Sequence, residues 1–235
     1  MLLYIIRHGD PIYDPDSLTP LGHRQAEAVG RRLAEIGLDR IYTSPMIRAQ
    51  MTAQPACEML HIEPQIEEWT AESLAWQDFS CDLDNGVHTW AFHAQNTDFN
   101  TEEVRSLGDE WYKAPHFSKV RGKEGYKRIQ DASDEFLARQ GYRRDGLVYR
   151  IERPNDDKIA VFCHEGFGVT WMSHLLSIPP QMFWASFDIT HTSVSILRFD
   201  NNSNGICQPK AMCIGDTSHI YAERLPMLHQ RVTRF

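Results

Sequence analysis

An uninterrupted apolar run at the start of the chain, Leu2–Ile6, leads directly into Arg7, His8 and Gly9. A short run with no polar break predicts a strand that is buried on both faces, as in a parallel sheet. Open α/β sheets bind ligands at the carboxyl ends of their strands, which is where this strand delivers an arginine and a histidine. Gly9 allows a sharp turn and a close approach of the backbone to a ligand. We therefore expect the chemistry of this chain at the end of its first strand.

Helix and strand signals alternate after this strand. Thr19 followed by Pro20 is typical of a helix cap with proline in the first turn, and Gly37 is placed to end that helix. Ser44 followed by Pro45 repeats the cap pattern. We predict a loop at 10–16, a helix at 19–36, a strand at 40–43, a helix at 44–60 and a strand at 62–66. This order predicts a parallel sheet with right-handed crossovers.

A second apolar strand also ends in a histidine. Lys158–Cys163 runs into His164-Glu165-Gly166, and a helix is predicted at 169–176. The long segment 74–121 is rich in aromatic residues, which argues against disorder and predicts a cap over the ligand-binding edge of the sheet. The other predicted segments are a helix at 124–140, a polar connection at 143–157 and closing strands at 192–197 and 211–214.

Composition excludes several classes of function. The formal net charge of −8 argues against a nucleic acid as the main partner, because binding one requires a basic surface. No stretch has the apolar length of a membrane span, and the first strand is too short for a signal peptide, so we expect a cytoplasmic protein. His88 and His93 have no carboxylate at a recognisable metal spacing. We expect packing roles for them, and no metal.

Four blocks in this chain resemble the histidine phosphatase superfamily, which includes the cofactor-dependent phosphoglycerate mutases. Residues 7–9 are similar to its RHG signature, and 18–26 are similar to its LT-x-x-G-x-x-QA helix. Residues 44–53 are similar to its S-P-x-x-R-A-x-x-T-A segment, and 164–166 to its second histidine block. The blocks occur in the family's order. The resemblance implies a single domain, 1–235, with a three-layer α/β/α fold, a mostly parallel central sheet and a cap insertion at about 74–121.

The resemblance also implies roles for individual residues. His8 would accept the phosphoryl group as a phosphohistidine, and Arg7 and Arg48 would bind the phosphate oxygens. His164, when protonated, would add a donor, together with the backbone N–H groups of Glu165 and Gly166. Neither a cofactor nor a metal is implied. Thr19 and Gly9 are secondary candidates, as the cap of the second block's helix and the turn after the first strand.

A proton-donating glutamate follows the third strand in this family, commonly in an L-x-E setting. Glu72 matches that position best, although Thr70 replaces the leucine, and Glu68 is the alternative. The acid would protonate the leaving alkoxide and later take a proton from the attacking water. A free glutamate has a pKa of ~4.3, so this residue needs an apolar or anionic setting to hold its proton near neutral pH.

Three functions are compatible with these residues. The first is a metal-independent phosphatase acting on a small phosphorylated substrate, and the second is a phosphoglycerate mutase. Mutases carry a longer segment after the RHG block, whereas only 10–17 lies between Gly9 and Leu18 here, which favours hydrolysis. The third is a non-catalytic phospholigand-binding protein, which would be expected to lose a histidine or an arginine. The sequence identifies neither the substrate nor the oligomeric state. It also leaves open which basic side chain of the cap faces the pocket: Arg105, Lys113, Lys119, Arg121 or Lys123.

Overall fold

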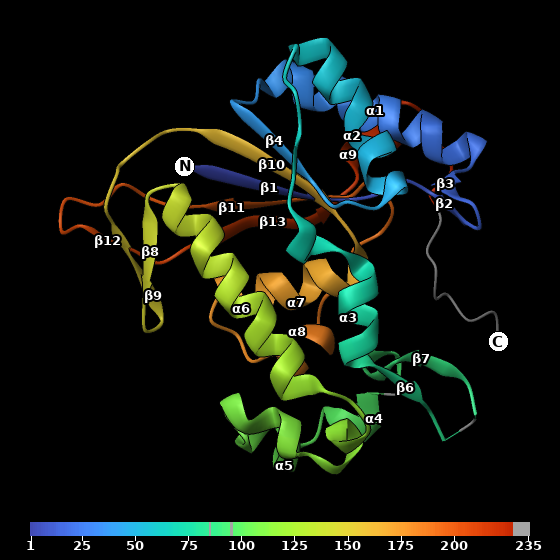
Figure 1. The fold of residues 1–235 in the computed structure, drawn as a ribbon, viewed down its shortest axis with the longest axis vertical. Helices are drawn as coiled ribbons and strands as arrows, with labels where there is room; N and C mark the ends of the chain where they lie inside the picture. Colours follow the sequence, from blue (N-terminus) through green and yellow to red (C-terminus); the bar gives the residue numbers. More distant parts are fainter. Residues whose placement is uncertain (85, 95, 228–235) are drawn as a thin grey trace.

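A six-stranded sheet runs through the centre of the computed structural model, which describes residues 1–84, 86–94 and 96–227 (Figure 1). Its strand order is β13-β11-β1-β10-β4-β5. The strands are β1 (Leu2–Arg7), β4 (Arg40–Thr43), β5 (Gln65–Ile66), β10 (Lys158–Cys163), β11 (Val194–Arg198) and β13 (Lys210–Asp216). The β1, β10, β4 and β5 pairings are parallel, and β11 and β13 add an antiparallel edge. The predicted mostly parallel sheet is confirmed.

Strand β1 is buried on both faces, as its apolar run predicts. Leu3 and Ile5 contribute to one hydrophobic cluster, and Tyr4 and Ile6 contribute to another on the opposite face. Figure 1 shows helices covering each face, with α1, α2 and α9 on one side and α3, α6, α7 and α8 on the other. Their bounds are α1 (Pro20–Ile36), α2 (Ile47–Leu60), α3 (Glu72–Phe79), α6 (Gly122–Arg139), α7 (Glu165–Leu175), α8 (Pro180–Trp184) and α9 (Ser218–Ala222). The predicted α/β/α fold class is confirmed.

Helix α1 begins as its cap sequence predicts. The Thr19 hydroxyl accepts a hydrogen bond from Gly22 N at 3.0 Å, and Pro20 occupies the first turn. Helix α2 begins later than Ser44-Pro45 predicts, with Met46 as its N-cap residue. The Ser44 hydroxyl accepts from Met46 N at 3.3 Å and is also hydrogen-bonded to His164. Helix α7 begins at Glu165 rather than near 169, with His164 as its N-cap. Packing of this buried helix overrides the low helix propensity of its glycines.

Two predicted connections contain strands. The predicted loop at 10–16 includes most of a hairpin, β2 (Pro11–Tyr13) paired with β3 (Asp16–Leu18). The predicted polar connection at 143–157 includes most of the β8 (Tyr142–Asp145) and β9 (Val148–Ile151) hairpin, which β12 (Ile206–Cys207) extends to three strands. These strands are short, and they lack a repeated apolar alternation that would identify them in the sequence. The predicted strand at 62–66 is shorter than expected, since only β5 forms.

The aromatic segment between α3 and α6 is folded, mainly into short helices. It contains the hairpin β6 (Ser80–Asp82) and β7 (His88–Trp90), the helices α4 (Asn96–Phe99) and α5 (Glu102–Ser106), and several 3₁₀ turns: η2 (Ala91–His93), η3 (Gly108–Lys113) and η4 (Pro115–Lys119). A further 3₁₀ turn, η1 (Glu68–Thr70), precedes α3. Trp111 lies edge-on to both Phe117 and Trp184 at centroid distances of 5.1 Å, so aromatic packing ties this segment to α8. Among the described residues, no helix is long and apolar enough to cross a membrane.

Candidate active site

The carboxyl end of β1 places His8 beside the end of β10. His8 N donates to Cys163 O at 2.9 Å, and Gly9 N donates to the Thr52 hydroxyl at 2.9 Å. A Cβ on Gly9 would lie 2.7 Å from Gly22 O, so only glycine lets the chain pass so close to α1. The turn predicted after the first strand is therefore held between α1 and α2.

The imidazole of His8 is buried and oriented by its own chain. His8 Nδ1 lies 2.7 Å from Gly9 O. Because a carbonyl oxygen only accepts, Nδ1 carries the proton and Nε2 keeps its lone pair. Burial, reinforced by His164 and then by Arg7 and Arg48, holds the pKa of His8 well below its ordinary value. The side chain is therefore neutral near pH 7, in the form that can act as a nucleophile.

His164 lies behind His8, fully buried at the amino end of α7. The two rings are 5.1 Å apart between centroids. His164 Nε2 is bonded to the Ser44 hydroxyl at 2.7 Å, and Nδ1 lies 3.5 Å from Glu72 Oε2. Burial, with Arg48 and Arg7 adding to it, keeps the pKa of His164 well below its ordinary value.

Both predicted phosphate-binding arginines are held by carboxylates. Arg7 Nη1 lies 2.8 Å from Glu165 Oε2 and also donates to Ile189 O at 2.7 Å. Arg48 Nη1 lies 2.8 Å from Asp16 Oδ1. The other oxygen of Asp16 accepts from Ile47 N at 2.8 Å, in the first turn of α2. Each guanidinium group is therefore paired with a carboxylate. Each carboxylate also lies at the amino end of a helix, Asp16 at α2 and Glu165 at α7, where an anion is favoured.

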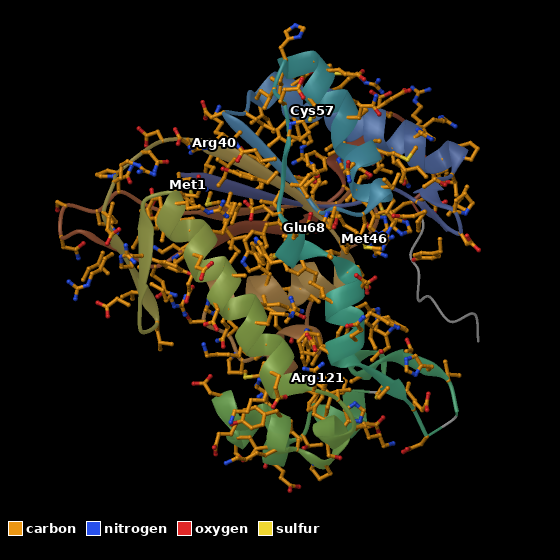
Figure 2. All side chains as sticks on the ribbon, viewed as in Figure 1. Met1, Arg40, Met46, Cys57, Glu68 and Arg121 are labelled. Atoms are coloured by element: carbon orange, nitrogen blue, oxygen red, sulfur yellow. The ribbon has the colours of Figure 1, made fainter. Side chains whose placement is uncertain are left out.

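The structure places the two candidate acids differently. Glu72 is the first residue of α3 and only 9% exposed, with Oε1 accepting from Phe167 N at 3.4 Å. Glu68 lies in η1, is exposed, and is not among the residues that line the cavity (Figure 2). Of these two glutamates, only Glu72 lies beside His164 and the cavity.

A cavity of about 570 Å³ opens over these groups. The predicted site residues among those lining it are Arg7, His8, Arg48, Glu72 and Glu165. His164, Gly166, Gly9 and Thr19 are not among its lining residues. The remaining lining residues were not predicted: Tyr13, Asp16, Met46, Ser73, Trp76, Gln77, Trp90 and His93. Their only sequence signal is that Met46 lies within a predicted block and that the others lie close to one in the chain or within the aromatic segment.

The expected packing roles of His88 and His93 are confirmed in part: His88 lies edge-to-face with Trp76 at a centroid distance of 5.4 Å, and His93 with Phe92 at 5.2 Å, but each also has a carboxylate partner that was not predicted. His93 lines the cavity, with Nε2 3.4 Å from Glu165 Oε1. His88 is exposed and lies 2.8 Å from Asp82. The short β6–β7 hairpin and the turn after it direct one histidine toward the cavity and the other toward solvent. Within the described ranges, no group of three or more His, Cys, Asp or Glu side chains is arranged to hold a metal ion.

Comparison with known proteins identifies the family of this chain. The model of the histidine phosphatase superfamily, branch 1, matches residues 3–208. This chain belongs to that superfamily. The match confirms the resemblance of the four sequence blocks to this family. As a histidine phosphatase, the protein is an enzyme of the phosphatase class.

Individual relatives of this histidine phosphatase are distant. Phosphoserine phosphatase 1 of Hydrogenobacter thermophilus is 22% identical over 221 residues, covering 90% of this chain and 92% of the relative. The phosphoserine phosphatase of Entamoeba histolytica, solved with 3-phosphoglyceric acid, has a TM-score of 0.61 at 21% identity and covers 93% of this chain and 98% of that one. A mycobacterial glucosyl-3-phosphoglycerate phosphatase has a TM-score of 0.60 at 18% identity, with 92% and 99% covered. These structures share the fold.

Proposed function

We propose that this histidine phosphatase hydrolyses a small phosphomonoester through a phosphohistidine on His8, without a metal ion. The observation that supports this most directly is the state of His8. Its Nδ1 is held by Gly9 O, and its depressed pKa leaves Nε2 unprotonated in a cavity that both arginines line. That arrangement is suited to in-line attack on phosphorus.

Arg7 and Arg48 bind the phosphate group in this proposal. A phosphomonoester dianion replaces the carboxylates of Glu165 and Asp16 as the partner of the guanidinium groups. Charge-assisted hydrogen bonds of this kind contribute roughly 1.5–3 kcal/mol each. The bound dianion opposes the burial that lowers the pKa of His164, so that His164 becomes protonated and adds a donor, together with the N–H groups of Glu165 and Gly166 at the amino end of α7, where the helix dipole favours an anion. The charge is neutralised by these groups, which is the role that metal ions have in other phosphoryl transfer enzymes.

Glu72 is the general acid and base. As His8 Nε2 forms a bond to phosphorus, the bond to the alcohol oxygen breaks and that oxygen takes the proton of Glu72. In the second step Glu72 takes a proton from water, and the water oxygen displaces His8 and releases inorganic phosphate. The position of Glu72 at the start of α3, beside His164 and in the cavity wall, supports this role over Glu68.

The chain is proposed to act as one domain, with residues 74–121 as its cap. Support comes from Trp76, Trp90 and His93, which belong to that segment and line the cavity. A phosphoglycerate mutase activity is the alternative. The hairpin β2–β3 fills the short segment after Gly9 and brings Asp16 into the cavity, which adds negative charge against a bisphosphate and favours hydrolysis. A cytoplasmic location stays a prediction.

Trapping the phosphoenzyme tests the mechanism. Mixing the enzyme with p-nitrophenyl phosphate and quenching it rapidly should yield protein-bound phosphate that is stable in alkali and labile in acid, as expected of a histidine phosphoramidate. His8→Asn should lose both the trapped phosphate and turnover. His23→Asn, an exposed histidine on α1, is the matched control and should retain both. Turnover near the parent rate in His8→Asn would show that His8 is not the nucleophile.

A further inference from the structure

The cavity contains few positive charges beyond those that bind phosphate. Among the described residues that line it, two have a lysine or arginine side chain, Arg7 and Arg48. Three have a carboxyl group: Asp16, Glu72 and Glu165. The basic residues of the cap lie elsewhere. Lys113 is ion-paired with Glu110, Lys119 is ion-paired with Asp84, and neither Arg105, Arg121 nor Lys123 is among the described lining residues. Figure 2 places Arg121 at the start of α6, separated from Met46 in the cavity wall.

Phosphate binding increases the negative charge of this cavity. The dianion competes with Asp16 and Glu165 for the same guanidinium groups, so it adds two charges where two carboxylates are already present. Glu165 is only 12% exposed, so water screens its charge weakly. A positive charge on the leaving group would reduce the repulsion, and a second anionic group would increase it. The cavity therefore discriminates between leaving groups by their charge.

The remaining walls combine aromatic side chains with the polar Ser73, Gln77 and His93, and His93 Nε2 lies 3.4 Å from Glu165 Oε1. Trp76 and Trp90 lie edge-to-face with ring centroids 4.8 Å apart, and Tyr13 and Met46 complete this part of the lining. The face of an indole or phenol ring attracts an ammonium group, and most strongly where the ammonium loses part of its water. Trp90 is buried and stacks on Phe92 at a centroid distance of 5.3 Å, so the half-buried Trp76 offers the more accessible ring. Indole rings and three carboxyl groups line the same cavity, which suits a cation, and particularly one that carries methyl groups.

From these observations we propose that the substrate is the phosphomonoester of an amino alcohol, with an ammonium group on the leaving alcohol. The inference rests on the proposed phosphatase activity and specifies its substrate class. The phosphate lies on Arg7 and Arg48, and the ammonium lies against Trp76 and Trp90 near the carboxylates of Asp16 and Glu165. A phosphorylated acid such as 3-phosphoglycerate brings a carboxylate to this negatively charged part of the cavity and is a poor substrate.

A pair of isosteric substrates tests the charge requirement directly. Phosphocholine and 3,3-dimethylbutyl phosphate have the same shape, and they differ only in the nitrogen or carbon atom that carries the three methyl groups. We expect kcat/KM for phosphocholine to exceed that for the neutral isostere by about tenfold or more, as a desolvated cation–π contact allows. 3-Phosphoglycerate should have a lower kcat/KM than either compound.

Variants then identify the groups responsible for the preference. Asp16→Asn and Trp76→Leu should each bring the phosphocholine-to-isostere ratio closer to one. Asp131→Asn, which removes an exposed carboxylate of α6, should leave the ratio unchanged. Equal kcat/KM for the two isosteres, or a preference for 3-phosphoglycerate, would overturn the substrate class if p-nitrophenyl phosphate is still hydrolysed. Failure to hydrolyse any of the four compounds would overturn the proposed function, and this inference with it.

Discussion

The state of His8 depends on one backbone carbonyl and on its burial. Gly9 O fixes the tautomer, and desolvation, with the neighbouring positive charges, keeps the ring neutral. The arginines that we propose to bind the substrate's phosphate thus also favour the neutral form of His8. Asp16 and Glu165 pair with these arginines in the absence of a substrate, so phosphate binding in this proposal has to displace both carboxylates.

At the scale of the residue, Glu72→Gln should slow substrates with poor leaving groups far more than p-nitrophenyl phosphate. The nitrophenolate leaves without a proton, whereas an alkoxide needs one. General acid catalysis typically contributes 10²–10⁴-fold, roughly 3–5 kcal/mol of barrier. Rapid-quench measurement of the phosphorylation step for an alkyl and an aryl phosphate checks this, because in the proposed mechanism Glu72 also assists the later attack of water.

Two further variants control for this comparison. Arg48→Ala should slow both substrates to the same extent, because phosphate binding does not depend on the leaving group. Glu68→Gln changes an exposed carboxylate outside the cavity lining and should have little effect. A leaving-group-dependent loss in Glu68→Gln, without one in Glu72→Gln, would reverse the assignment of the acid.

At the scale of the element, the first turn of α1 supports the segment that follows the nucleophile. Thr19 caps the helix, and its hydroxyl also donates to Asp10 Oδ2 at 2.7 Å. Gln25 Oε1 accepts from Asp10 N at 2.8 Å. One helix therefore holds the backbone just after Gly9 through side chains from successive turns. This explains why a cap motif and a nucleophile motif occur close together in the sequence.

The close contact at Gly22 predicts that an alanine at this position destabilises the protein. Alanine at an ordinary helix position is roughly 1 kcal/mol more favourable than glycine. A Cβ on Gly22, however, would lie 2.2 Å from Asp10 O, so the backbone after His8 must move. We expect Gly22→Ala to destabilise the protein by about 1–3 kcal/mol and to lower kcat/KM. Urea unfolding and an activity assay check both effects, and a variant more stable than the parent would contradict the contact.

At the scale of the whole molecule, neutral buried histidines link stability to pH. His219 of α9 lies 3.4 Å from Arg32 Nη1 through Nδ1 and 3.1 Å from the Thr192 hydroxyl through Nε2. Because a guanidinium only donates, Nδ1 accepts and the ring is neutral. Burial, together with Arg32 and against Asp216, lowers the pKa of His219 from 6.5 to about 4. The contacts of His219 with Arg32 and Thr192, which are distant from it in the chain, thus depend on an uncharged imidazole ring.

This linkage predicts a loss of stability in acid. Between pH 6.5 and about 4 the unfolded chain binds a proton at His219 that the folded chain does not, so stability falls as the pH falls through this window. The contribution reaches about 1.4 kcal/mol per pH unit. His219→Gln keeps a donor and an acceptor without titrating. The unfolding free energy, measured from pH 7.5 to 4.5, should therefore fall less steeply in this variant. Equal slopes would show that His219 is protonated in the folded state.

The sequence by itself determined the main parallel strands and the helices that follow them, together with the principal candidate residues of the site, but not the β2–β3 hairpin. His8, Arg48 and His164 lie in short blocks where a buried strand or a capped helix begins or ends, and burial and capping depend on neighbours a few residues away. Such signals can be seen in a window of about ten residues. The mostly parallel sheet follows from the alternation of these blocks.

Only the tertiary structure decided how the cavity is completed. Asp16 faces Arg48, and Glu165 faces Arg7 just beyond the carboxyl end of the β1–β10 pairing, where Arg7 lies opposite Cys163. Glu72 rather than Glu68 borders the cavity, and Trp76, Trp90 and His93 form its walls. These contacts join elements that are far apart in the chain, and no local period encodes them. Their positions depend on how whole elements pack, which is a property of the folded molecule alone.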